Sequence, residues 1–163
     1  MIDEVAVAYH EAGHALLAER FGAHVLSVTI QPANDDGPRR HGETTIAWIP
    51  GGKTSEQLSM QQARVALAGP VAEMIYCDEQ YEVRVIREWW ADWLAAAGAI
   101  RQIRGQLSDD AVLAVIGQLV EELIEWFSQD EVWDRLARLA DELEAHDTLE
   151  RDQLDELRQL GFL

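Results

Sequence analysis

The sequence has 163 residues, of which 48% are apolar and 26% charged, and its formal net charge is -17 at pH 7. This length and composition fit one globular domain, residues 1–163, with a single hydrophobic core. The acidic charge argues strongly against DNA, RNA or an anionic membrane as the main partner, because these are bound through clustered lysine and arginine, and Lys53 is the single lysine. No apolar run reaches the roughly 18 residues of a membrane span, so we expect no membrane insertion.

The cysteine content and the N-terminus bear on the compartment. Cys77 is the single cysteine, so an intrachain disulfide cannot form. Asp3 and Glu4 stand where a secretion signal carries basic residues. Both features are typical of a cytoplasmic protein, which is the localisation we expect.

The beginning of the chain predicts one helix followed by two strands. Apolar residues recur at helical spacing over residues 3–21, with Asp3 as the N-cap and Gly22 as the stop signal. Residues 24–30 and 43–50 are rich in β-branched side chains and flank a loop crowded with Pro, Gly, Asn and Asp. We therefore expect a small antiparallel hairpin directly after the first helix.

The rest of the chain predicts helices alone, and they cover residues 54–76, 82–104, 108–127, 128–145 and 150–160. Thr54 with Gln57 and Ser128 with Glu131 have the spacing of capping boxes, and Ser108 suits an N-cap. The sequence therefore predicts a mainly helical fold with one β-hairpin.

The first predicted helix contains the motif HExxH, formed by His10, Glu11 and His14. Residues four positions apart lie on one face of a helix, so both imidazoles can bind the same metal ion. Zinc suits imidazole ligands and, in hydrolytic sites, leaves one position to a water whose pKa falls to roughly 7. Glu11 can then act as the general base that takes a proton from this water and returns it to the leaving amine.

Four segments, in this order, resemble the FtsH-type peptidases, the zinc-dependent proteolytic domains of membrane-bound AAA proteases. VAYHEAGHALLA resembles the zinc helix of that family, and VLSVTIQP with GETTIAWIP resembles its hairpin. QARVALAGPVAEMIY resembles its second helix, and EAHDTLERDQLDEL its C-terminal end. The resemblance covers nearly the whole chain and implies a zincin-like helical domain with one small β-hairpin after the HExxH helix.

The resemblance also suggests a third zinc ligand. In the FtsH-type family this ligand is an aspartate in a Gly-Ala-x-x-Asp-Leu stretch on a downstream helix. The resemblance therefore points to Asp92 in REWWADWLAAAG, although Glu88 and Trp89 stand where the family has Gly-Ala. Glu73 is the alternative ligand. Its position matches a family glutamate, and there it would accept the other N–H of a ligating histidine. The remaining candidate ligands are Asp78, Glu79 and Glu88.

Two further segments have patterns associated with ligand binding. The segment ETTIAWI can form an exposed strand edge that aligns a peptide by β-augmentation, with Thr45, Ile46 and Ala47 in contact, or a small lid without a substrate role. AWIPGGKT meets a loose phosphate-loop pattern, but the parallel sheet that such loops need is not predicted, so we interpret it as a turn plus a helix cap. The histidines without ligand-like spacing, which we expect at the surface, are His24, His41 and His146.

These features predict a zinc-dependent endopeptidase that hydrolyses peptide bonds in unfolded or flexible polypeptides with a metal-activated water. We expect it to be free-standing, without the AAA ATPase domain, and therefore independent of ATP. It would cut flexible peptides or work with a separate unfoldase, and the sequence leaves its oligomeric state open. The alternative is a catalytically inactive, metal-stabilised protein-interaction module of the same fold, which the missing Gly-Ala favours.

Overall fold

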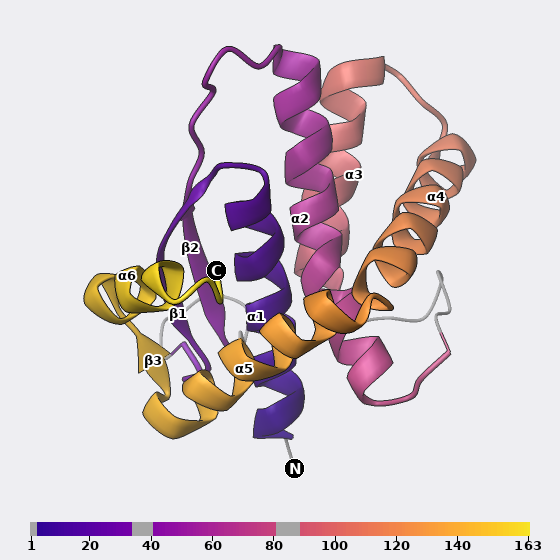
Figure 1. The fold of residues 1–163 in the computed structure, drawn as a ribbon. Coiled ribbons are helices and arrows are strands. Elements are labelled where there is room, and N and C mark those ends of the chain that lie inside the picture. The colour runs from indigo at the N-terminus through magenta and orange to yellow at the C-terminus, as the bar shows by residue number, and fades with distance from the viewer. Residues whose placement is uncertain (1–2, 34–40, 81–88) are drawn as a thin grey trace.

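The computed structural model describes residues 3–33, 41–80 and 89–163. Over these ranges six helices pack with a small three-stranded antiparallel sheet (Figure 1). The helices are α1 (Glu4–Arg20), α2 (Ser55–Tyr76), α3 (Trp90–Arg104), α4 (Asp109–Phe127), α5 (Asp130–His146) and α6 (Arg151–Gln159). The strands are β1 (His24–Thr29), β2 (Glu43–Ala47) and β3 (Thr148–Leu149). The chain is therefore mainly helical, as the sequence predicts.

Helix α1 lies at the centre of the molecule, between α2, α5 and the sheet (Figure 1). Asp3 caps its first turn by accepting hydrogen bonds from the backbone N–H groups of Val5 and Ala6. The chain leaves the helix through Gly22, whose φ of +77° suits glycine. The predicted helix at residues 3–21 is thus confirmed, and its central place brings the HExxH residues close to several elements at once.

A glycine brings α1 and α2 into close contact. A Cβ atom added at Gly13 would lie 2.7 Å from the carbonyl oxygen of Ala68 and 2.8 Å from the Cβ of Ala72. Both distances are too short for carbon, so only glycine allows the two backbones this approach. Side chains that leave α1 on this face therefore meet α2 directly.

The sheet contains the predicted hairpin and one further strand. β1 and β2 are antiparallel, with Val25 opposite Ile46 and Thr29 opposite Glu43. β3 pairs with the other edge of β1, and the hydroxyls of Thr29 and Thr148 lie 2.7 Å apart. The third strand is an addition to the prediction, because two residues are too short to show an alternating pattern. Over the described ranges the strand order is β2-β1-β3, so β2 is an edge strand.

The later helices follow the prediction apart from one start signal. Thr54 and Gln57 form the predicted capping box of α2, and Ser108 caps α4. The capping box predicted at Ser128 is wrong, because its hydroxyl donates to the carbonyl oxygen of Ile124 and so ends α4 instead of starting α5. Of the helix predicted over 82–104, α3 forms the part from Trp90 onward, and 82–88 lie outside the described residues.

The buried side chains of the helices and of β1 form one continuous hydrophobic core. Its largest fully buried members come from different elements and include Val25, Val71, Ile100, Phe127, Leu139 and Leu154. Among the helices that the structure describes, none is both long and apolar enough to cross a bilayer.

Candidate metal centre

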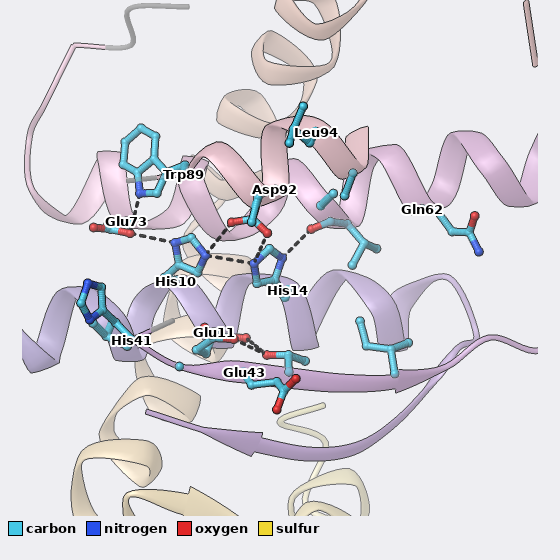
Figure 2. A pocket seen from close by; sticks show the side chains of 18 of the residues that line it. His10, Glu11, His14, His41, Glu43, Gln62, Glu73, Trp89, Asp92 and Leu94 are labelled. Atoms are coloured by element: carbon cyan, nitrogen blue, oxygen red, sulfur yellow. Dashed lines mark hydrogen bonds and ion pairs between the residues drawn. The ribbon is translucent and has the colours of Figure 1, made fainter. Parts of the chain in front are cut away.

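His10 and His14 of α1 meet Asp92 of α3 in a cluster between α1, α2 and α3 (Figure 2). The Nε2 atoms of the two histidines are 3.0 Å apart. Asp92 places Oδ2 3.1 Å from Nε2 of His10 and Oδ1 3.5 Å from Nε2 of His14. Three possible ligand atoms, one from each residue, lie within 4.8 Å of one another. The structure thus brings together the three residues that the sequence nominates as ligands.

The hydrogen bonds of the two Nδ1 atoms determine which ring nitrogens of His10 and His14 face the cluster. Nδ1 of His14 lies 2.7 Å from the carbonyl oxygen of Val65, and Nδ1 of His10 lies 2.7 Å from Oε2 of Glu73. A carbonyl or carboxylate oxygen only accepts, so both Nδ1 atoms carry hydrogen and donate. In neutral imidazoles both Nε2 atoms then present lone pairs to one another and to the Asp92 carboxylate. Such an arrangement requires a positive charge, either a proton or a metal ion.

The spacing of these atoms is close to that of a tetrahedral zinc site. With zinc at about 2.0 to 2.1 Å from each ligand, tetrahedral angles place the ligand atoms about 3.3 Å apart. The two Nε2 atoms are 3.0 Å apart and Oδ2 of Asp92 lies 3.1 Å from Nε2 of His10, which is close to that value, whereas a set of one ligand atom from each residue lies within 4.8 Å. Two imidazoles and one carboxylate also form a ligand set known from catalytic zinc sites, in which the fourth position stays open. The donor set therefore fits zinc in its chemistry, and a small rotation of the Asp92 carboxylate would bring one of its oxygens to ligand distance from both histidine nitrogens.

The same contacts shift the pKa values of two of these groups. Burial lowers the pKa of His10, but hydrogen bonds with Asp92 and Glu73 outweigh this effect and raise the pKa to about 10. Burial raises the pKa of Asp92, yet the charge of His14 and the hydrogen bond with His10 leave it below its usual value. Without a metal, a proton on His10 therefore supplies the positive charge between the ligands, and a bound cation would displace it.

Glycine provides the space for the His14 ring. A Cβ added at Gly69 of α2 would lie 2.3 Å from Nε2 of His14 and 2.6 Å from its Cε1. Any larger residue at this position would push the ring away from the Val65 carbonyl. Contact with the His14 ring therefore explains why residue 69 is glycine, although glycine in the middle of a helix lowers helix stability.

Glu73 connects the cluster to a tryptophan. Its Oε2 accepts from Nδ1 of His10 and also from the indole Nε1 of Trp89, at 2.7 and 2.8 Å. Glu73 lies one helical turn after Gly69 on α2. Over the described residues, the group that could hold a metal contains Asp92 and does not contain Glu73. Glu73 thus accepts the Nδ1 hydrogen of His10, which is the second of the two roles that the sequence suggested for it.

Glu11 lies on a different side of α1 from the two histidines. In Figure 2 the imidazoles point toward α2 and α3, whereas the Glu11 side chain lies on the β2 side. Its Oε2 accepts a hydrogen bond of 2.7 Å from the hydroxyl of Thr44, and the side chain is buried. A Cβ at Gly42 would lie 2.7 Å from Cγ of Glu11, so glycine is needed there as well. The Glu11 carboxylate is therefore held against β2.

A cavity of about 880 Å³ joins Glu11, the two histidines and Asp92. Its wall includes Glu43, Thr44 and Ile46 of β2 and also Trp48, which follows the strand. Thr45 and Ala47, which we nominated for peptide contact together with Ile46, do not line the cavity. The strand thus runs along the cavity, but of the three nominated side chains only that of Ile46 lines it.

Among the cavity residues that sequence reasoning missed, His41 and Thr44 lie beside Glu11 and Gly42. His41, which we expected at the surface, is exposed but lines the cavity beside Gly42. Thr44 holds the Glu11 carboxylate. Neither position has a periodic or motif signal, because both come from the loop and strand that fold back onto α1. Of the remaining candidate ligands, Glu79 lines the cavity, Asp78 does not, and Glu88 lies outside the described residues.

The sequence was also compared with known proteins. No family model matches the chain, and no curated protein matches it either.

Proposed function

We propose that this chain is a zinc-dependent endopeptidase domain with a zincin-like fold, related to the FtsH-type peptidases. The observation that carries the proposal is the convergence of ligand atoms from His10, His14 and Asp92 within 4.8 Å of one another, on the wall of a large cavity. The resemblance of the sequence segments supports the same function. In this function the protein would hydrolyse flexible or unfolded polypeptides without ATP.

The proposed reaction divides the work among few side chains. His10, His14 and Asp92 would hold the zinc ion, and when bound it supplies Lewis-acid chemistry that polarises a carbonyl and lowers the pKa of water to about 7. Glu11 takes a proton from the water that attacks the peptide carbonyl carbon. It then gives a proton to the amide nitrogen as the C–N bond breaks. This role requires the carboxylate to turn from Thr44 toward the histidines.

The cavity and the edge strand suit an extended peptide. A volume of about 880 Å³ falls within the roughly 300 to 1,000 Å³ typical of ligand sites. Over the described ranges β2 pairs with β1 on one side, so its other backbone edge can bond with a peptide strand. Ile46 would then contact a substrate side chain within the cavity.

One observation favours a second function, a metal-stabilised interaction module without turnover. The hydrogen bond of Glu11 to Thr44 holds the proposed base on the β2 side of α1. If this bond persists in the metal-bound protein, the cluster stabilises the fold but lacks a base.

Peptide cleavage by the zinc-loaded protein separates the two functions. We expect it to cut an unstructured peptide library, with products identified by mass spectrometry. Glu11→Gln should retain zinc but cleave roughly 100-fold or more slowly, because it removes the base. Glu4→Gln, which changes an exposed carboxylate on the same helix, is the matched control. Zinc binding without cleavage by the parent protein would reject the peptidase in favour of the module.

A further inference from the structure

The indole of Trp89 reaches the metal centre through Glu73 (Figure 2). One carboxylate oxygen, Oε2 of Glu73, accepts from Nε1 of Trp89 at 2.8 Å and from Nδ1 of His10 at 2.7 Å. We infer that Trp89 is a positioning residue for the metal site, which orients His10 through Glu73. This inference rests on the proposed function, because it assigns to Trp89 a role in metal binding.

The indole is oriented toward Glu73 for a reason other than burial. Trp89 is 8% exposed, and its Nε1–H can only donate. Burial alone does not require a partner for an indole in this protein, since the buried Nε1 of Trp126 has none over the described ranges. At Trp89, in contrast, the N–H meets a carboxylate that already accepts from His10. A charge-assisted bond of this kind restricts both rings.

The start of α3 acts on both ring nitrogens of His10, on Nε2 directly and on Nδ1 through Glu73 of α2. Trp89 is the N-cap residue of α3, and Asp92 lies in the first turn of this helix. Asp92 approaches Nε2 of His10, while Trp89 reaches Nδ1 through Glu73. The N-cap makes no side-chain cap bond to the helix. The bond from Trp89 to Glu73 therefore links the beginning of α3, and with it Asp92, to α2.

Loss of the indole N–H should weaken metal binding while leaving every ligand in place. Without this donor, the Glu73 carboxylate can rotate about its χ angles, and its bond to His10 no longer fixes the ring. Partners that orient a ligating histidine typically change metal affinity by about 10 to 100-fold. We expect a loss in the lower part of this range, because Glu73 itself remains.

The test compares Trp89→Phe with Trp90→Phe. Both changes remove an indole N–H and keep an aromatic ring, but Trp90 is 58% exposed. Zinc affinity, measured by competition with a chelator, should fall about tenfold in Trp89→Phe and stay within about twofold in Trp90→Phe. In a Glu73→Ala background, Trp89→Phe should have no further effect, because the two side chains act in series. Additive losses, or equal affinities of the two tryptophan variants, would overturn the inference.

A second measurement uses the metal-free protein. The ¹⁵N resonances of the His10 ring should shift in Trp89→Phe and remain unchanged in Trp90→Phe. Unchanged His10 resonances in Trp89→Phe would overturn the positioning role whatever the zinc result. Failure of the proposed function has a different signature, since the parent protein would then bind no zinc although the His10 resonances still respond to Trp89.

Discussion

His14 donates its Nδ1 hydrogen to the backbone carbonyl of Val65 at 2.7 Å, and this bond determines which of its nitrogens faces His10 and Asp92. The acceptor is a main-chain atom of α2, so it cannot rotate away as a side chain can. Nε2 of His14 therefore faces Nε2 of His10, 3.0 Å away. The packing of α1 on α2 thus fixes how the two imidazole rings face each other in the metal-free protein.

The first prediction concerns the glycine beneath this ring. Gly69→Ala places a Cβ 2.3 Å from Nε2 of His14, so the ring has to leave the Val65 carbonyl. We expect zinc affinity to fall roughly 10 to 100-fold, as for other changes that disorient a ligand. Gly117→Ala on α4 is the control, because its new Cβ meets nothing within 4 Å. That change should raise the free energy of unfolding by about 0.5 to 1 kcal/mol and leave zinc affinity unchanged. Equal zinc affinity in the two variants would contradict this account of the Gly69 position.

Zinc binding should release a proton from His10. Its pKa of about 10 in the folded metal-free protein, against 6.5 for the free side chain, means that it is protonated at about pH 8. In the metal-free protein this group contributes stability that is complete below pH 6.5 and is lost as the pH rises through about 10. Zinc requires the neutral ring. Calorimetric titration at about pH 8 in buffers of different ionisation enthalpy should therefore detect about one proton released per zinc. A binding heat that is independent of the buffer would exclude this exchange.

The single lysine should stabilise α1 and bind no phosphate. Nζ of Lys53 donates to the carbonyl oxygen of Phe21, the C-cap residue of α1, at 2.5 Å. Lys53→Met should lower the free energy of unfolding by about 1 kcal/mol, since a cation at a helix C-terminus is favourable. Arg64→Met removes an exposed pair with Glu122 and should cost about 0.5 kcal/mol or less in the same denaturant titration. ATP should leave the melting temperature of the parent protein unchanged. A higher melting temperature with ATP would instead support a phosphate loop at AWIPGGKT.

Arg158 should connect the C-terminal helix α6 to the HExxH helix. Its guanidinium donates to Oε1 of Glu19 and to the carbonyl oxygen of Val25, and both charged side chains are largely buried. Arg158→Met leaves the Glu19 carboxylate without its cation, so we expect a loss of about 2 kcal/mol in the free energy of unfolding. Arg135→Met, in an exposed pair with Glu131, should cost about 0.5 kcal/mol or less. Similar losses in both variants would show that the Arg158 pair does not link α6 to α1.

The sequence predicts the helices and part of the site for different physical reasons. His10 and His14 could be paired from spacing alone, because helix periodicity fixes which residues share a face. The N-caps Asp3, Thr54 and Ser108 follow from local hydrogen bonding, which nearby residues decide. Asp92 could be nominated by resemblance alone, since its approach to His10 depends on how α3 packs.

Other parts of the site depend on contacts between distant segments, which spacing cannot reveal. The need for glycine at positions 69 and 42 becomes visible once the rings and carboxylates that they face are known. Thr44 and His41 reach the cavity because the hairpin folds back on α1. Ser128 had the sequence signal of an N-cap, but its hydroxyl bonds backward to α4. A serine between two helices can serve either one, and local sequence does not decide between them.

The central claim is that His10, His14 and Asp92 hold one zinc ion, and metal analysis tests it most directly. The parent protein and its Asp92→Ala and Glu73→Ala variants would be loaded with zinc, dialysed and assayed for metal per chain. We predict one zinc per chain in the parent, a near-complete loss in Asp92→Ala and partial retention in Glu73→Ala, whose carboxylate contacts His10 from outside the cluster. Full zinc content in Asp92→Ala, or none in the parent protein, would contradict the assignment.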